Sequence, residues 1–435
     1  MEDTLRVLLV GNGGREHAIA WKLLQSPLIE HIFVVPGNGG TATLQKVTNV
    51  SSIKQEDFSA LARFAKDNDV NFLVPGPEAP LVAGIVDYFK REDERIRAFG
   101  PTEAASRMEG SKTFSKDFMR KHSIPTAAYA NFSSYDEATK YIETITHDVV
   151  IKASGLAAGK GVIIPQSTDE AHAALKEIML DKEFGAAGDE VVIEEFLKGD
   201  ELSILSFSDG TTIRSLPPAQ DHKRIRDGDE GPNTGGMGTY APTRIAPPDV
   251  VDRIHRDILQ PTIDGMKADG FSFTGVLFTG LMMTESGPKV LEYNVRFGDP
   301  ETQSLLSLLD SDLAEIMVAC TKGKLSEVEV KISGKSAATV VVAAGGYPGS
   351  YAKGTAITLD PVPQDVVIFH AGTSFTENTL KTSGGRVIAS TATAATLEDA
   401  VLKAYRGVDC IHFDGMQYRT DIAGRALKSK AGTKV

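Results

Sequence analysis

The sequence has few cysteines, no long apolar run and no excess of basic residues, and each absence excludes a class of protein. Its two cysteines, Cys320 and Cys410, lie far apart, which argues against a disulfide framework or a thiolate metal site. No apolar run approaches the roughly 20 residues of a membrane span, and the acidic start Met1–Asp3 is unlike the basic leader of a signal peptide. A net charge of -12 disfavours binding to nucleic acid or to an anionic membrane. We therefore expect a cytoplasmic protein that binds neither.

The length of 435 residues predicts roughly three domains, and the first of them shows alternating strands and helices. An apolar run from Leu5 to Val10 ends at the glycine turn Gly11–Gly14, and helical spacing follows from His17 to Leu24. Similar runs end at glycine or proline turns at three further places, 32–35, 72–74 and 98–99. This alternation indicates a parallel sheet with its loops at the carboxyl ends of the strands. We predict a Rossmann-like domain over residues 1–108.

The turn at Gly11–Gly14 matches the dinucleotide-binding fingerprint only in part, because Glu16 stands where that pattern has glycine. A carboxylate in the first helical turn would repel a pyrophosphate. We therefore expect a smaller anion at the glycine turn and the helix N-terminus. A plain tight turn is the alternative interpretation.

The middle of the chain has shorter strands, which indicate antiparallel pairing. Helices are predicted from Lys112 to His122 and from Thr168 to Leu180. Two hairpins are predicted, 149–153 with 162–165 and 191–196 with 202–207. The segment Asp221–Gly238 is rich in glycine and charge, lacks apolar periodicity, and is predicted to be a long functional loop.

The last part of the chain is predicted to begin with a strand pair and to end in a separate module. The strands are expected at 273–283 and 289–293, followed by a helix at 303–309. After about residue 330 the pattern is rich in strands again. Residues Lys428–Val435 are predicted to form a tail or linker.

The run Gly155–Gly161 resembles a phosphate-binding loop, although its spacing differs from the Walker A pattern and Gly161 replaces the Ser or Thr that binds magnesium. Lys160 lies in this glycine-rich loop and Lys152 lies on the strand before it. Two ammonium groups beside free backbone N–H groups suit a polyphosphate. The alternative is a flexible surface hairpin with solvated lysines.

Glu292 and Asn294 lie on the same face of a predicted strand, since side chains alternate with a period of two. Carboxylate and amide oxygens are ligands that Mg²⁺ prefers. The run Arg296–Glu301 follows at once and surrounds a glycine with charges of both signs. The charged run Asp221–Arg224 and the glycines of 235–238 would suit a small zwitterion and would shield a reactive intermediate.

Together these segments resemble the phosphoribosylamine–glycine ligase family, also called glycinamide ribonucleotide synthetase, of the ATP-grasp superfamily. The resemblance covers nearly the whole chain, and the Arg-Phe-Gly-Asp-Pro-Glu run at 296–301 is its most specific motif. It implies an α/β and α+β protein: a Rossmann-like N-terminal domain, an ATP-grasp core with a mobile lid, and a small strand-rich C-terminal domain. The implied bounds are 1–108, 109–325 with the lid at about 124–192, 330–427, and a tail or linker at 428–435.

The resemblance implies an ATP site in the core and the lid. Lys112, Lys152 and Lys160 would lie near the phosphates or the adenine, and Glu201 would hold the ribose hydroxyls. The remaining implied nucleotide contacts lie in the lid loop and in a linker that holds the adenine edge through its backbone: Gly159, Gly161, Glu194, Glu195, Phe196 and Leu197. Glu292 with Asn294 would bind Mg²⁺ or Mn²⁺.

The resemblance also implies the substrates and the reaction. Glycine would be joined to 5-phosphoribosylamine through glycyl phosphate, giving glycinamide ribonucleotide, ADP and phosphate in de novo purine biosynthesis. Asp221, Lys223 and Arg296 would act at the glycine end. The ribose phosphate would be held by loops of the first domain: Gly13, Gly14, Asn38, Gly39, Gly40, Pro77 and Glu78.

Two competing functions remain open at this point, and a fusion is expected. One competitor is another ATP-grasp ligase or carboxylase, which bicarbonate-dependent ATP hydrolysis would reveal. The other is a nicotinamide-dependent oxidoreductase or nucleotide-binding regulator that uses the first glycine turn, against which Glu16 argues. Eukaryotic members of the family are commonly fused to aminoimidazole ribonucleotide synthetase, and the lysine-rich tail at 428–435 would suit such a junction.

Overall fold

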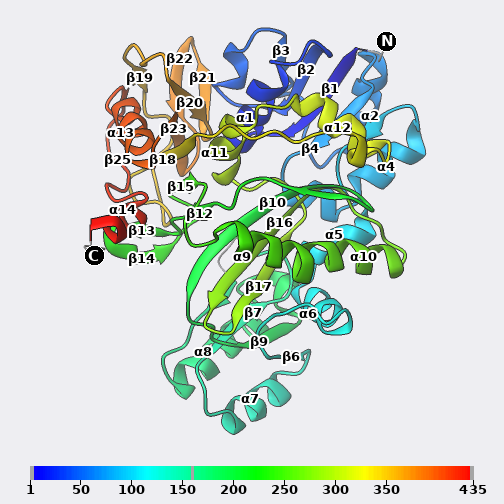
Figure 1. Ribbon diagram of the computed structural model, residues 1–435, viewed down its shortest axis with the longest axis vertical. Helices are drawn as coiled ribbons and strands as arrows, with labels where there is room; N and C mark the ends of the chain where they lie inside the picture. Colours follow the sequence, from blue (N-terminus) through cyan, green and yellow to red (C-terminus); the bar gives the residue numbers. More distant parts are fainter. Residues whose placement is uncertain (1–3, 158–160, 432–435) are drawn as a thin grey trace.

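The computed structural model describes residues 4–157 and 161–431, and its chain begins with a five-stranded parallel sheet (Figure 1). This N-terminal sheet has the order β3-β2-β1-β4-β5, with β1 Leu5–Gly11, β2 Ile29–Pro36, β3 Val47–Asn49, β4 Phe72–Pro75 and β5 Arg97–Ala98. Its helices are α1 Gly14–Leu23, α2 Phe58–Asp67, α3 Glu78–Val82, α4 Ile85–Glu92 and α5 Glu103–Gly110. The central strand β1 is apolar and almost wholly buried, as a parallel sheet covered on both faces requires. The predicted Rossmann-like start is confirmed.

Two antiparallel sheets follow and lie one below the other in Figure 1. The core sheet has the order β11-β10-β16-β17, with β10 Asp200–Asp209, β11 Ile213–Ser215, β16 Thr274–Thr284 and β17 Gly287–Asn294. The lid sheet has the order β6-β9-β7-β8, with β6 Tyr129–Phe132, β7 Val149–Ala153, β8 Val162–Ile163 and β9 Val191–Glu195. Helices α6 Lys112–Lys121, α9 Pro248–Ile254 and α10 Gln260–Ala268 accompany the core, and α7 Tyr135–Thr144 and α8 Thr168–Met179 accompany the lid.

The hairpin predicted from 191–196 and 202–207 is wrong, although both strands exist. β9 pairs with β6 on one edge and with β7 on the other, while β10 pairs with β11 and β16. The linker 196–199 therefore crosses from the lid sheet to the core sheet. At Gly199, φ is 155° and an added Cβ would lie 2.0 Å from the carbonyl oxygen of Met283, so only glycine fits this crossing.

The C-terminal sheet combines late strands with two strands from the middle of the chain. Its order is β12-β15-β18-β23-β20, with β25 beside β18. The strands are β12 Gln220–Asp221, β15 Gly238–Ala241, β18 Ser336–Ala344, β20 Val366–His370, β23 Arg386–Ala394 and β25 Met416–Gln417. Smaller pairs are β19 Thr358–Leu359 with β24 Ile411–His412, and β21 Thr373–Thr376 with β22 Thr379–Thr382. The helices are α11 Glu301–Leu308, α12 Leu313–Thr321, α13 Leu397–Val408 and α14 Gly424–Ala431. The strand-rich C-terminal part is confirmed.

Two predictions concern irregular segments, and the first needs correction. The long loop predicted at 221–238 contains a short antiparallel hairpin, β13 Arg224–Arg226 with β14 Glu230–Asn233. Turn glycines at Gly228 and Gly231, both with positive φ, allow this fold where apolar periodicity gives no signal. The segment predicted as a tail or linker from Lys428 begins within α14, which continues to Ala431, and its remaining residues lie outside the described part of the chain.

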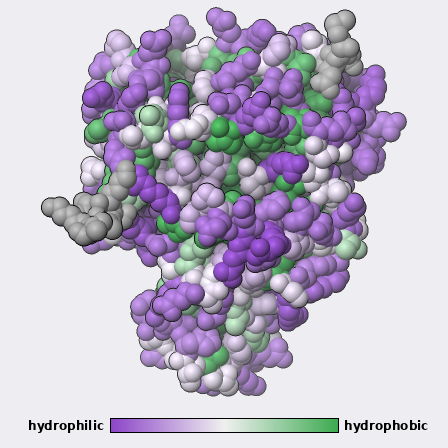
Figure 2. Space-filling view, viewed as in Figure 1, coloured by the Kyte–Doolittle hydropathy of each residue, from purple (hydrophilic) through white to green (hydrophobic). Residues whose placement is uncertain are grey.

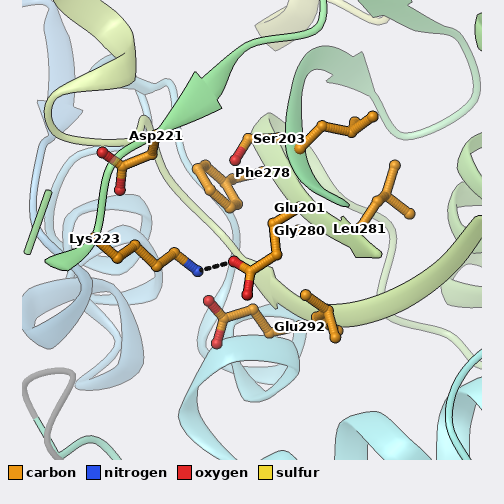
Figure 3. A pocket seen from close by; sticks show the side chains of 10 residues that line it. Glu201, Ser203, Asp221, Lys223, Phe278, Gly280, Leu281 and Glu292 are labelled. Carbon is orange, nitrogen blue, oxygen red and sulfur yellow. Dashed lines mark ion pairs between the residues drawn. The ribbon is translucent and has the colours of Figure 1, made fainter. Parts of the chain in front are cut away.

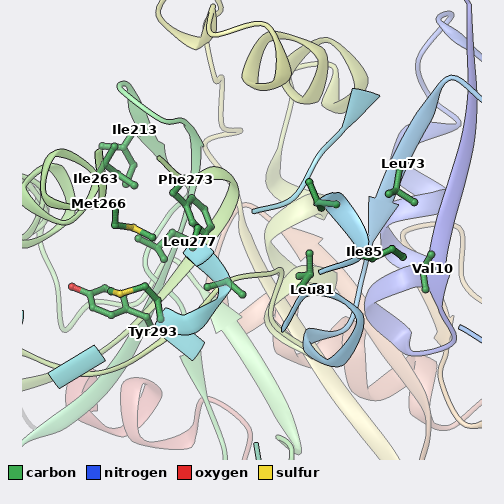
Figure 4. Packing of buried hydrophobic residues seen from close by; sticks show 14 of the residues in the cluster. Val10, Leu73, Leu81, Ile85, Ile213, Ile263, Met266, Phe273, Leu277 and Tyr293 are labelled. Atoms are coloured by element: carbon green, nitrogen blue, oxygen red, sulfur yellow. The ribbon is translucent and has the colours of Figure 1, made fainter. Parts of the chain in front are cut away.

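The domains share a continuous apolar interior. One buried cluster joins the N-terminal sheet, represented by Val10 and Leu73, to the core sheet, represented by Phe273, Leu277 and Tyr293 (Figure 4). The outer face seen in Figure 2 is largely hydrophilic, and the lid projects from it as a narrower lobe. None of the helices in the described part of the chain is long and apolar enough to cross a bilayer.

A buried histidine pair joins the first domain to the last. The backbone N–H of His370 in β20 donates to Nδ1 of His17 in α1 at 2.9 Å, so this nitrogen of His17 is unprotonated. Burial, and then the neighbouring His370, lower the pKa of His17 from 6.5 to about 3. Burial also lowers the pKa of His370 to about 4. The contact therefore requires two neutral imidazoles.

This histidine contact is expected to fail in acid. Below pH 6.5 the unfolded chain binds protons on both histidines while the folded chain does not, so stability is complete above about pH 6.5 and decreases as the pH falls toward 4. The loss amounts to about 3 kcal/mol for each histidine at pH 4. Calorimetry should show that His17→Gln, which keeps an acceptor for the His370 N–H, weakens the dependence of the melting temperature on pH. The exposed control His147→Gln should leave the wild-type dependence unchanged.

Candidate functional site

The site predicted for the reactants is a pocket beside the core sheet. It is lined by residues of β10, β16 and β17 and by the segment that begins with β12: Glu201, Leu202, Ser203, Asp221, Lys223, Phe278, Gly280, Leu281, Leu291 and Glu292. Figure 3 shows the side chains of Lys223, Glu201 and Glu292 pointing toward one another. Lys223 Nζ lies 2.9 Å from Glu201 Oε2. Glu201, and after it Glu292, raise the pKa of Lys223, so the lysine is a permanent cation here.

Asp221 also lines this pocket, on the same side as Lys223 in Figure 3, and differs from the other carboxylates. Burial and the charge of Glu301 raise its pKa well above the ordinary value, while Lys223 and Arg386 oppose the shift. The pKa of Glu301 is raised as well, chiefly by burial. Two carboxyl groups in this position favour a bound cation. The ammonium group of an amino acid would meet that requirement.

The metal ligands predicted from the sequence fit a divalent cation. Among the described residues, the Glu292 carboxylate has no hydrogen-bond or ion-pair partner of its own. Although burial would raise its pKa, the charges of Lys223, Lys152 and Lys112 lower it, so Glu292 is ionised. Asn294 Oδ1 lies 3.4 Å from Arg296 Nη2. The described residues contain no group of three or more His, Cys, Asp or Glu side chains arranged to hold a metal ion.

The lysines predicted to bind phosphate lie where the lid sheet meets the core sheet. Lys152 Nζ on β7 lies 2.9 Å from Glu194 Oε1 and donates to the carbonyl oxygen of Leu291 on β17 at 3.2 Å. Lys112 Nζ donates to the carbonyl oxygen of Gly155 at 3.2 Å, and burial lowers its pKa. The carbonyl oxygen of Gly161 accepts from the N–H of Ala153 on β7 at 2.8 Å. Gly159 and Lys160 lie outside the described residues.

A second lysine at Glu194 was missed by the sequence analysis. Lys116 Nζ lies 2.9 Å from Glu194 Oε2, on the other oxygen from Lys152, and both Lys116 and Glu194 are almost fully buried. Burial lowers the pKa of Lys116 to about 8. Two ammonium groups and one carboxylate leave a surplus positive charge, which favours an anionic ligand. The signal was available, because Lys116 follows Lys112 by one helical turn.

In the linker predicted to hold adenine, two backbone N–H groups are already hydrogen-bonded within the protein and are not free for a base. The N–H of Glu195 donates to Ala128 at 2.8 Å and that of Phe196 donates to Asp148 at 3.0 Å, both to carbonyl oxygens. A base edge would therefore bind to the carbonyl oxygens of this linker or to the N–H of Leu197. The side chain of Glu194 forms ion pairs with Lys116 and Lys152 instead.

Arg296 lies between two carboxylates contributed by the first part of the chain. Its Nη2 lies 2.9 Å from Glu109 Oε1 in α5, and its Nε lies 3.4 Å from Glu78 Oε2 in α3. Glu109 also accepts from the N–H of Val295 at 2.7 Å. Although burial would raise the pKa of Glu78, the charges of Arg296 and Arg15 lower it. Glu109 was missed by the sequence analysis because no motif surrounds it.

At the first glycine turn, where the sequence predicted a bound anion, two carboxylates of the chain itself accept the backbone N–H groups. Glu16 Oε2 accepts from the N–H of Gly13 at 2.6 Å, and Asp299 Oδ2 accepts from the N–H of Arg15 at 3.2 Å. A Cβ on Gly14 would lie 2.5 Å from Gln303 Nε2, so glycine allows α1 to approach the core closely. Gly13 and Gly14 therefore lie where the first domain meets the Asp299 turn.

The second predicted ribose-phosphate loop has its polar groups already paired. Asn38 Oδ1 accepts from the N–H groups of Gly40 and Thr41, and its Nδ2 donates to the carbonyl oxygen of His370 at 2.8 Å. Gly39 N–H donates to Thr373 at 3.1 Å. Pro77 precedes Glu78 at the start of α3, near Arg296. The ribose-phosphate roles of these residues stay predictions, and a ligand at Asn38 would have to compete with the C-terminal domain.

The charged groups of the lid junction and of the pocket beside it are suited to a nucleoside triphosphate and an amino acid. Lys152 of the lid sheet and Lys112 of α6 face the ionised carboxylate of Glu292 on the core sheet. The neighbouring pocket is lined by the carboxyl groups of Glu201, Asp221 and Glu292 and by Lys223. Two antiparallel sheets that meet at such a site define the ATP-grasp class. The fold agrees: a biotin carboxylase from Campylobacter jejuni, 13% identical, superposes with a TM-score of 0.75 over 95% of this chain and 92% of that one.

Comparison with known proteins identifies the family. Models described as phosphoribosylglycinamide synthetase match this chain in three parts, the N domain at 5–109, the ATP-grasp (A) domain at 110–302 and the C domain at 337–425. The chain belongs to the phosphoribosylglycinamide synthetase family, as the sequence resemblance predicted. A phosphoribosylamine–glycine ligase from Vibrio cholerae is 47% identical over 97% of this chain and 99% of its own length. The crystal structure of a phosphoribosylamine–glycine ligase from Thermotoga maritima, 35% identical, has a TM-score of 0.84 over 96% of this chain and 100% of that one.

Some relatives are much longer than this chain. The bifunctional purine biosynthetic protein ADE1 of Schizosaccharomyces pombe is 58% identical over 99% of this chain, which spans 55% of that protein. The bifunctional protein PUR2,5 of Pichia angusta is 57% identical, and the chain again spans 55% of it. The chain thus corresponds to about half the length of these fungal relatives.

Proposed function

We propose that this chain joins glycine to 5-phosphoribosylamine at the expense of ATP, giving glycinamide ribonucleotide, ADP and phosphate in de novo purine biosynthesis. The observation that carries the proposal is the match to the Vibrio cholerae ligase over nearly the full length of both chains. The site geometry supports it, because lysines for a polyphosphate and an acidic pocket for an amino acid lie side by side.

The proposed reaction has two steps. A carboxylate oxygen of glycine attacks the γ-phosphorus of ATP, which forms glycyl phosphate and releases ADP. The amine of 5-phosphoribosylamine then attacks the glycyl carbonyl carbon, so the C–N bond forms, the C–O bond to phosphate breaks, and the amine loses a proton. One carboxylate oxygen of glycine leaves in the phosphate. No protein nucleophile is required, and the protein positions the reactants and neutralises charge.

The residues divide these tasks between them. Lys152 and Lys112 face the phosphates from the lid side, and Glu201 holds the ribose hydroxyls. Asp221 pairs with the glycine ammonium group, while Lys223 and Arg296 compensate the charge of the carboxylate and of the transferring phosphoryl group. A Mg²⁺ or Mn²⁺ ion held by Glu292 and Asn294 would neutralise the polyphosphate. Closure of the lid would protect both labile intermediates from water.

The longer relatives support a second part of the proposal. We infer that the native polypeptide carries a further enzyme after this chain, aminoimidazole ribonucleotide synthetase, and that the whole protein acts in the cytoplasm. The fungal relatives are named bifunctional, and the chain spans 55% of each. Mass measurement of the protein isolated from its natural source would test the fusion. A mass that matches 46.6 kDa would contradict it.

An assay of ADP release tests the ligase activity. We expect ADP to form only when glycine and 5-phosphoribosylamine are both present, and glycine labelled with ¹⁸O in its carboxylate should transfer one labelled oxygen to phosphate. Bicarbonate in place of glycine should give no ADP. Bicarbonate-dependent ADP formation would identify a carboxylase instead, and unlabelled phosphate would contradict the acyl phosphate route.

A further inference from the structure

Arg386 of the C-terminal sheet reaches into the site of the core domain. It begins β23, and its Nη1 donates to the carbonyl oxygens of Gly235 and Asp299, both at 2.6 Å, and to that of Gly236 at 3.4 Å. Its Nη2 lies 3.9 Å from Asp299 Oδ2. One guanidinium therefore ties two core segments, which are distant in sequence, to the C-terminal domain.

The two segments that Arg386 holds are in contact with predicted site residues. Gly236, with φ of 114°, lies so close to Asp221 that an added Cβ would be 2.7 Å from Asp221 Oδ1 and 2.5 Å from Pro300 Cδ. The N–H of Gly235 donates to the hydroxyl of Tyr347, also of the C-terminal domain, at 3.0 Å. The 234–237 loop is thus pressed between Asp221 and the C-terminal domain.

Asp299 extends this linkage to the first domain. Its Oδ2 accepts from the N–H of Arg15 at the start of α1, and its Oδ1 accepts from Gln303 Nε2 at 2.9 Å. Arg386 and Arg15 lower the pKa of Asp299 against the effect of burial. All three domains therefore meet at the pair formed by Arg386 and Asp299.

We propose that Arg386 is a positioning residue for the glycine and 5-phosphoribosylamine side of the ligase reaction. Its guanidinium fixes the Gly235–Gly236 backbone against Asp221 and the Asp299 turn against α1. Of the residues proposed for the ATP phosphates, Lys152 lies on the lid sheet and Lys112 begins α6, which are other elements than the Gly235–Gly236 and Asp299 segments that Arg386 holds. A lysine is not an equivalent replacement, because its shorter stem ends in a single ammonium and has no counterpart of Nη2, which lies 3.9 Å from Asp299 Oδ2. The inference rests on the proposed ligase function.

The test compares Arg386→Gln and Arg386→Lys with the exposed control Arg406→Gln on α13 of the same domain. We expect both Arg386 variants to lose about 10- to 100-fold in kcat/KM for 5-phosphoribosylamine, with KM for ATP within about twofold of the wild-type value. The control should match the wild type. An equal rise in KM for ATP, or full activity in Arg386→Gln, would overturn the proposal.

Hydrogen exchange provides a readout that does not depend on the reaction. In the wild type the N–H of Thr234 donates to the carbonyl oxygen of Lys223 and that of Met237 donates to the carbonyl oxygen of His222. We expect Arg386→Gln to accelerate exchange in 234–237 by about 10-fold or more while α13 is unchanged. Unchanged exchange would refute the positioning role. A wild-type protein without glycine-dependent ADP formation would refute the proposed function alone, and exchange would still decide the role of Arg386.

Discussion

Replacing Lys152 by alanine is expected to lower glycine-dependent ADP formation by roughly 10²- to 10³-fold, the usual effect of removing one group that stabilises charge in a transition state. Lys152 is almost fully buried at the junction of the lid and core sheets, with its Nζ 2.9 Å from Glu194 Oε1. In the proposed reaction this ammonium faces the transferring phosphoryl group. Steady-state measurement of ADP release with saturating glycine would show the loss mainly in kcat.

The fold should survive this substitution. Glu194 keeps an ion pair with Lys116 at 2.9 Å, so its buried carboxylate is not left without a cation. A suitable control is Lys140→Ala on α7, because Lys140 is an exposed lysine of the same lid. Wild-type turnover in Lys152→Ala, with Lys140→Ala equally active, would refute the phosphate-binding role of Lys152.

The parts of the fold that local pattern determines were predictable from the sequence. Apolar runs that end in glycine or proline turns located β1, β2 and β4, because a strand buried on both faces must be apolar throughout. The strand predicted to carry Glu292 and Asn294 is present as β17, and their role as metal ligands stays a prediction. Local sequence could not show that β9 and β10, which were predicted to form a hairpin, belong to different sheets. Both have hairpin-like sequences, and only the lid strands β6 and β7 occupy the edges that β9 would need.

Two of the residues that the sequence analysis missed, Glu109 and Arg386, act on segments that are distant in sequence. Glu109 reaches Arg296 across 187 positions and Arg386 reaches Asp299 across 87, so no spacing rule connects them. Glu16 shows a related effect. Taken alone, its carboxylate argued only against a dinucleotide, whereas in the structure it accepts from Gly13 and pairs with Arg15 at 2.6 Å, so its charge is already compensated. Charge balance in a buried site is a property of the assembled fold.

Replacing Arg296 by methionine is expected to abolish measurable ligation and to destabilise the protein by about 3–5 kcal/mol, because a buried charge loses its partner. Arg296 is the cation between Glu78 and Glu109, and burial already raises the pKa of Glu109. Without the guanidinium these two carboxylates would lie close together in a water-poor site. Chemical denaturation would measure the stability, and the exposed control Arg256→Met should have no measurable effect.

A double variant separates the structural role of Arg296 from its chemical role. Adding Glu109→Gln to Arg296→Met removes one of the two uncompensated carboxylates, so part of the lost free energy of unfolding should return. Activity should not return with it, because no cation would then oppose the charge of the acyl phosphate. Recovery of both would mean that Arg296 serves only to hold Glu78 and Glu109 together. Recovery of stability alone, with Glu109→Gln by itself still active, would place the guanidinium of Arg296 at the reacting groups, since a folded site without this charge would then fail to transfer the phosphoryl group.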